Sequence, residues 1–171
     1  SQADASSGTF AMTTVSASGA VSVTVGSGAA GGAGNMTVSG LSTASSFSFT
    51  ASQNGDLSLQ AISASSSLSI NANGAGSLTT SALFTTGALS IDKTLGSAET
   101  MTIQDLSAGN TTITLGGASG HISASTVSTD AFTLDASASL EDTSAFVFNT
   151  ISAEGATNIT LGANNAYTGS A

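Results

Sequence analysis

Ten carboxylates, one histidine and one lysine carry the reactive chemistry available to this chain. Asp130 and Asp135 flank one predicted strand, and Glu141 and Asp142 are neighbours at a predicted corner. Two suitably spaced carboxylates can cleave a glycosidic bond, one as acid and the other as base or nucleophile. Glycosidase sites also hold their sugar with basic or aromatic side chains, and here there is no Arg, no Trp and a single Tyr. We therefore expect no enzymatic activity and no catalytic residues.

The single histidine, His121, follows Gly120 at the start of a predicted strand. A metal site or a nucleophile–base pair needs partners at ligand or hydrogen-bond spacing, and the sequence pattern offers none. The glycine-rich calcium repeat requires Asp at a fixed place after its glycines, whereas residues 31–36 contain glycines but no Asp. The sequence thus predicts a solvent-facing histidine, no bound metal and no cofactor.

Three sequons begin at Asn35, Asn110 and Asn158. In a chain this rich in Ser and Thr, we interpret them as coincidences of composition. Two of them overlap predicted strands, which also disfavours modification.

A repeated pattern in residues 36–76 indicates the elements that must position these side chains. Met36-Thr37-Val38 and Phe47-Ser48-Phe49 are followed 21 positions later by Leu57-Ser58-Leu59 and Leu68-Ser69-Ile70. Alternation of apolar and polar residues predicts short strands with one buried face. A fixed step of this size predicts a repeat architecture.

The pattern extends over most of the chain as three ordered apolar positions in each turn. The first triplets start near Met12, Met36, Leu57, Leu78, Met101, Ile122 and Phe146. The lone apolar residues are Val15, Leu41, Ile62, Leu83, Leu106, Val127 and Ile151. The second triplets start at Val21, Phe47, Leu68, Leu89, Ile113, Phe132 and Ile159.

This order predicts an all-β fold, a parallel β-solenoid (β-helix) of about seven turns of about 21–24 residues each. The expected organisation is a polar N-terminal segment at 1–9, a solenoid domain at 10–165 and a C-terminal tail at 166–171. Segments 26–34 and 94–99 lengthen two of the turns. An antiparallel β-sandwich is the alternative, because many short strands with small turns also describe that class.

Composition restricts the partners. The net charge is −9, 6% of residues are charged, and Cys is absent. Binding to nucleic acid is not expected, because clustered Lys and Arg supply that affinity. No apolar run approaches the length of about 18 residues that a membrane helix needs. We therefore expect a chain that is not membrane-spanning.

The Ala/Ser/Thr/Gly bias, the lack of Cys and repeats such as Asp56-Leu57-Ser58-Leu59 resemble the β-strand repeats of bacterial surface-layer proteins and large secreted adhesins. This resemblance spans residues 10–165. It implies a secreted, extracellular protein at the cell surface, exported by a one-step or autotransporter-like route. Surface-layer proteins commonly carry calcium motifs, and their absence here argues against a lattice anchored by calcium.

The predicted function is that of a non-enzymatic structural protein that assembles with other copies of itself, end to end, into a filament, sheath or surface layer. Neither end shows a capping helix, and uncapped solenoid ends expose strand edges that can pair with another copy. The predicted assembly edges are Met12, Val15, Val21, Val23, Val25, Phe146, Phe148, Ile151, Ile159 and Leu161. The alternative is an adhesin stalk or an ice- or glycan-binding solenoid module, with a glycan or a surface as its contact.

Overall fold

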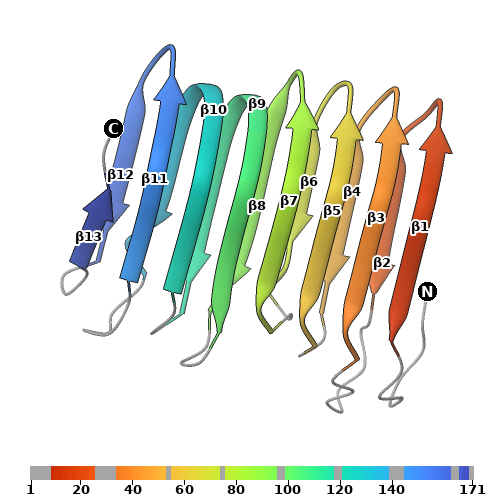
Figure 1. Cartoon of the computed structure of the whole chain (residues 1–171), viewed down its shortest axis with the longest axis horizontal. Coiled ribbons are helices and arrows are strands. Elements are labelled where there is room, and N and C mark those ends of the chain that lie inside the picture. Colours follow the sequence, from red (N-terminus) through yellow and green to blue (C-terminus); the bar gives the residue numbers. More distant parts are fainter. Residues whose placement is uncertain are drawn as a thin grey trace.

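A computed structural model shows the chain as a stack of coils, each of which travels up one side and down the other (Figure 1). The structure describes residues 9–25, 34–52, 55–73, 76–95, 99–117, 121–138, 145–162 and 166–169. The first coil lies at one end of the stack and the last coil at the other, with the order of the sequence kept between them. The described part of the chain contains strands and no helix.

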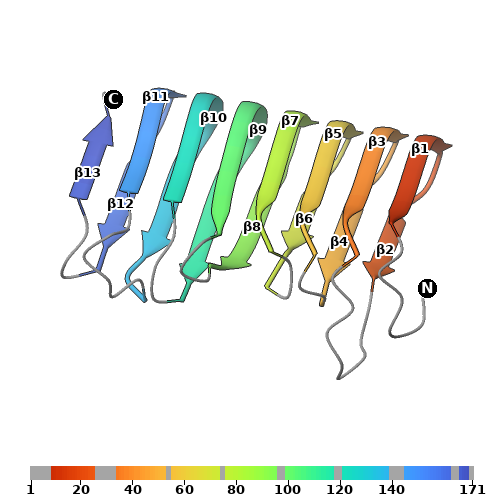
Figure 2. The ribbon, with the colours of Figure 1, turned by 60° about the horizontal axis from the view of Figure 1, so that its bottom comes forward.

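Most coils consist of a longer first strand, a tight corner and a shorter second strand (Figure 2). The first strands are β1 (Phe10–Ala17), β3 (Met36–Thr43), β5 (Leu57–Ala64), β7 (Leu78–Thr85) and β11 (Ala145–Ala153). The second strands are β2 (Val21–Val25), β4 (Phe47–Ala51), β6 (Leu68–Asn71), β8 (Ala88–Thr94) and β12 (Thr157–Leu161). β9 (Thr100–Gly116) and β10 (His121–Ala136) run through the corner unbroken, and β13 (Ala166–Gly169) follows the last coil.

Every strand pairing among the described residues is parallel. First strands pair with first strands and second strands with second strands. Because β9 belongs to both rows, the bonded order reads β1-β3-β5-β7-β9-β8-β6-β4-β2. The predicted parallel β-solenoid is confirmed, and the antiparallel sandwich is excluded.

The register confirms the lone apolar column and corrects the triplet alignment at three places. Val15, Leu41, Ile62, Leu83, Leu106, Val127 and Ile151 share one column. However, Met12 pairs with Val38, so the first triplet begins at Phe10 and the first step is 26 residues. Ile113 pairs with Ile91, and Ile159 pairs with Leu134. Each of these alignments was wrong by two residues.

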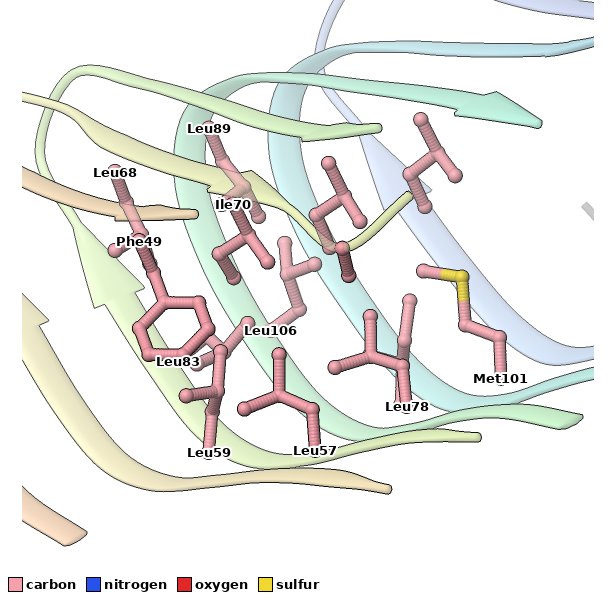
Figure 3. Packing of buried hydrophobic residues seen from close by; sticks show 14 of the residues in the cluster. Phe49, Leu57, Leu59, Leu68, Ile70, Leu78, Leu83, Leu89, Met101 and Leu106 are labelled. Carbon is pink, nitrogen blue, oxygen red and sulfur yellow. The ribbon is translucent and has the colours of Figure 1, made fainter. Parts of the chain in front are cut away.

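The core lies between the two rows of strands. Leu57, Leu59 and Leu78 point inward from the first strands and meet Phe49 and Ile70 from the second strands (Figure 3). These side chains are at most 1% exposed. Nearer the last coil, the rings of Phe132 and Phe148 meet edge to face across the interior, with centroids 5.8 Å apart. A single coil would leave its inward apolar side chains exposed above and below, and the neighbouring coils of the stack bury them.

The first strands bend around the core where two consecutive residues face outward. In β1, β3, β5 and β7 the bend places one residue at positive φ: Thr14, Gly40, Ala61 and Ala82. Glycine tolerates this conformation, whereas for a residue with a Cβ it costs about 1–2 kcal/mol. Coil spacing imposes a second demand on glycine, because a Cβ at Gly87 would lie 1.8 Å from the Ser66 carbonyl oxygen.

The corner after each first strand shows a period of two coils. Its inward column reads Ala17, Thr43, Ala64, Thr85, Ala108, Thr129 and Ala153. The threonine hydroxyls bond the backbone: Thr43 donates to the Gly19 carbonyl, and the Thr129 hydroxyl lies 2.9 Å from the Gly109 carbonyl oxygen. Thr43 and Thr129 thus tie their coils to the coil before, whereas the Thr85 hydroxyl accepts from the Gly87 amide of its own coil.

Candidate assembly edges and outward faces

The N-terminal edge of the stack is formed by β1 and β2. Among the described residues β1 pairs with β3 alone and β2 with β4 alone, so their other edges carry no strand. The amide of Phe10 donates to the Asn35 carbonyl oxygen, 3.0 Å away. Because successive amides of a strand point to opposite sides, the amide of Ala11 faces the open side. This edge therefore presents backbone groups in the direction in which the coils stack.

Apolar side chains reach the surface at this same edge. Met12, Val15 and Val21, predicted as edge residues, are half-buried and pack against the core, as does Phe10, which the prediction missed. In later coils the equivalent side chains are covered on both sides. Phe10 could have been recognised from its position two residues before Met12, on the same face of the strand.

The C-terminal edge is formed by β12 and β13. β12 pairs with β10 alone among the described residues, and its Ile159 and Leu161 are half-buried. β13 pairs with the first part of β11, from Ala145 to Phe148. The segment predicted as a tail thus adds a strand to the stack.

Five predicted edge residues have little exposed surface. Val23 and Val25 are 7% and 2% exposed, and Phe146, Phe148 and Ile151 are 1%, 0% and 9% exposed. For Phe146 and Phe148 the reason is visible, because β13 lies beside them and pairs with their backbone. The apolar surface available for contact is therefore concentrated in Phe10, Met12, Val15, Val21, Ile159 and Leu161.

Side-chain oxygens join successive coils where the first strands begin. The Asn35 side chain accepts from the amide of Asp56, and the Asp56 carboxylate accepts from the amide of Ser77 at 2.9 Å. The Ser77 hydroxyl then accepts from the amide of Thr100 at 3.1 Å. In each case the acceptor belongs to the earlier coil and the donor to the later one, so the stack has a chemical direction.

Of the residues considered for metal binding or catalysis, the structure describes His121, Asp130 and Asp135, and all three belong to β10. His121 is exposed at the start of β10, as predicted. Asp130 is exposed at the corner of the same strand, and Asp135 faces outward beyond it. Glu141 and Asp142 lie outside the described residues. No group of three potential metal-ligating side chains occurs in the part of the chain that the structure describes.

The lone lysine lies in the core, which the sequence prediction missed. Lys93 is 0% exposed and occupies an inward column beside Leu115. Its ammonium group donates to the Glu99 carboxylate at 3.0 Å and to the backbone carbonyl of Thr94. The order Leu89, Ile91, Lys93, Leu95 could have revealed it, because the lysine is in phase with inward residues. The whole cationic charge of the side chains is thereby neutralised inside the stack.

The outer faces are covered with hydroxyl and amide groups. One column of the second strands reads Ser22, Ser48, Ser69, Ser90, Thr112, Thr133 and Asn158. The three sequon asparagines, Asn35, Asn110 and Asn158, are all exposed. In the neighbouring column, Asp135 is held as a carboxylate: hydrogen bonds from the Ser137 hydroxyl and amide lower its pKa.

The fold and its exposed edges define the class of the protein as a β-solenoid repeat protein. No protein-family model, curated protein or solved structure matches the chain. Within the described residues, no helix has the length and apolarity needed to cross a membrane.

Proposed function

We propose that this protein is an extracellular structural subunit that assembles by stacking its first coil on the last coil of another copy. The observation that carries the proposal is the coincidence of open strand edges with half-buried apolar side chains at both ends of the stack. An open edge with apolar residues is a template for further strand pairing. The extracellular location rests on the resemblance to surface-layer and adhesin repeats.

The direction of the stack favours contact between the first coil of one copy and the last coil of the next over contact between two first coils or two last coils. Parallel pairing runs from the first coil to the last, and the acceptor-to-donor order of Asn35, Asp56 and Ser77 has the same direction in the coils between. A second copy that stacks in the same direction continues the parallel pairing. A heterologous contact of this kind does not close on itself, so it generates a filament.

Charge opposes assembly at long range. Each copy carries a net charge of −9, and its one lysine is paired internally. The Debye length falls from about 30 Å at about 0.01 M salt to about 3 Å at about 1 M. Filaments are therefore expected to form more readily at high salt.

A substitution of Ala11 tests the proposed edge. Ala11→Pro removes an amide that faces the open side while leaving the Phe10 amide bonded to β3. Ala11→Ser is the matched control, because it keeps the amide and adds a hydroxyl like that of the adjoining Thr37. Losing one interfacial hydrogen bond weakens the contact by about 1–2 kcal/mol. The concentration needed for filaments to form should therefore rise roughly tenfold.

The measurement is negative-stain microscopy of the purified chain over a concentration series, with circular dichroism to show that each variant is folded. The parent chain and Ala11→Ser are expected to form filaments, and Ala11→Pro is expected to stay dispersed until much higher concentration. The proposal fails if the parent chain is dispersed at every concentration, or if the proline variant assembles like the parent.

A further inference from the structure

One outward column of the first strands is serine in every coil but one. In register, Phe84 stands among Ser16, Ser42, Ser63, Ser107, Ser128 and Ser152. Phe84 is 47% exposed and is the single large hydrophobic side chain exposed among the described residues. Core packing does not explain it, because its neighbours Leu83 and Thr85 are the residues that face inward.

Phe84 borders a groove of about 300 Å³ on the outer face of β7, β9 and β10. The apolar part of the groove includes Leu83 and Leu106, each 2% exposed. Asp105, Ser107 and Thr126 also line the groove, although almost all of its surface is apolar. An apolar surface with a few polar groups is the usual composition of a small-ligand site, and this volume is at the lower end of the range of about 300–1,000 Å³.

The groove coincides with a change in how the first strands bend. Up to β7 the bend contains a residue at positive φ, ending with Ala82, whereas no described residue of β9 or β10 has positive φ. Between β7 and β9 the paired register stops at Thr80 and resumes at Leu83. The two strands are thus unpaired over two residues, beside the lining residues Ala82 and Asp105. Every other pair of first strands skips one residue at the bend, so the interruption beside the groove is one residue longer than in the other coils.

The chemistry of the lining selects the ligand. Asp105 and the net charge of −9 disfavour phosphate, sulfate or uronic acid, since the chain has no second cation to offer beyond the buried Lys93. The face of an aromatic ring is negative and attracts polarised C–H groups. Carboxylate and hydroxyl oxygens can accept hydrogen bonds, and the hydroxyls can also donate them.

We propose that this groove binds an uncharged sugar ring of a glycan. The C–H face of the ring lies on Phe84, and its hydroxyls bond to Asp105, Ser107 and Thr126. A second copy of this chain fits the groove poorly, because it brings another acidic surface to Asp105. The site lies in the middle of the stack, away from the edge residues Met12 and Ile159, so it is independent of filament formation.

The experiment is a titration followed by amide NMR shifts, at low salt and low concentration, where the proposed filaments are expected to be dispersed. The probes are neutral oligosaccharides of the β-glucan, mannan and chitin types, with oligogalacturonate and oligolysine as charged comparisons. A neutral oligosaccharide is expected to shift the amides of 82–84, 105–107 and 126–128.

Phe84→Ser is the test variant, because it places at this position the serine that every other coil has in the same column. It is expected to leave the midpoint of thermal unfolding close to that of the parent chain. This substitution should lower the affinity for the neutral oligosaccharide at least tenfold. Ser42→Ala, in the same column two coils away, is the matched control and should bind like the parent. The proposal is overturned if no neutral oligosaccharide shifts these amides, if Phe84→Ser binds equally well, or if oligolysine alone binds. Concentration-dependent shifts of the same amides without any sugar would instead assign the groove to a second copy.

Discussion

Two kinds of buried threonine hydroxyl occur in the interior. Thr43 is 3% exposed, and its hydroxyl donates to the Gly19 carbonyl and accepts from the Ser45 amide. Thr80 is 0% exposed, and its hydroxyl has no hydrogen-bond partner among the described residues. A buried polar group without a partner costs about 1–3 kcal/mol, whereas a satisfied one contributes about 1 kcal/mol. The same residue type thus acts in opposite directions at two places in one core.

Replacing each threonine by valine, which has nearly the same shape, separates the two cases. Thr80→Val is expected to raise the free energy of unfolding by about 1 kcal/mol, because it removes an unsatisfied hydroxyl. Thr43→Val is expected to lower it by about 1–2 kcal/mol, because the Ser45 amide loses its acceptor. Urea denaturation followed by circular dichroism measures both changes. Shifts of the same sign in the two variants would contradict this interpretation.

Asp135 gives a prediction about pH. Hydrogen bonds from the Ser137 hydroxyl and then the Ser137 amide lower the pKa of the Asp135 carboxyl below its ordinary 3.8. Because the folded value is the lower one, the carboxylate contributes to stability above pH 3.8, and this contribution is lost as the pH falls through the folded pKa. Ser137→Ala should raise the pKa of Asp135 toward 3.8. Carboxyl carbon NMR titration measures it, and an unchanged pKa would refute the assignment.

At the scale of elements, the ion pair of Lys93 and Glu99 joins β8 to the segment that leads into β9. The ammonium group is 0% exposed, whereas the Glu99 side chain is 32% exposed. Removing one partner of a buried pair costs more than replacing the cation by an apolar residue of similar length. The loss of Glu99 is therefore expected to destabilise the fold more than the replacement of Lys93 by an apolar residue.

Two variants test the role of this pair. Glu99→Gln is expected to lower the free energy of unfolding by about 1–3 kcal/mol, because it removes the charge that balances the buried ammonium. Lys93→Met keeps an apolar stem in the core and should change stability by less than about 1 kcal/mol. In the double variant, Glu99→Gln should have little further effect. Additive losses in the double variant, measured by denaturation, would show that the two side chains act independently.

The element scale also shows what the sequence could predict. Most of the inward apolar residues could be identified from the sequence because burial alternates with a period of two. The errors at Met12, Ile113 and Ile159 were all shifts of two residues, which keep every side chain on its own face. The shift at Ile113 arises because the residue that pairs with Leu89 is Thr111. The shift at Ile159 arises because the residue that pairs with Phe132 is Thr157. A threonine at these positions interrupts the apolar pattern.

The candidate sites were less predictable for a related reason. The burial of Lys93 depends on its ion pair with Glu99, which lies beyond the strand that contains the lysine, and a lysine is almost never fully buried unless it is paired. The groove beside Phe84 depends on the change of bend between β7 and β9, and that change has no signature in the apolar pattern. Both features arise from interactions between coils rather than within one strand.

At the scale of the whole molecule, the protein is a directional stack of coils (Figure 1). Columns of hydroxyl side chains line its sides, and half-buried apolar side chains lie at its two edges. Its sides carry polar side chains that water satisfies, whereas its ends carry strand edges that another strand can satisfy. Contact through the ends therefore buries more apolar surface and pairs more backbone groups than contact through the sides. This difference is the physical basis of the proposed filament.

Fibre diffraction from aligned filaments of the purified chain tests the central claim most directly. If first coils stack on last coils, the spacing of about 4.8 Å between neighbouring strands lies along the filament axis, because the strands run across it. The predicted result is a meridional reflection at that spacing. A filament with this reflection on the equator, or no ordered filament at any salt concentration, would contradict assembly through the ends of the stack.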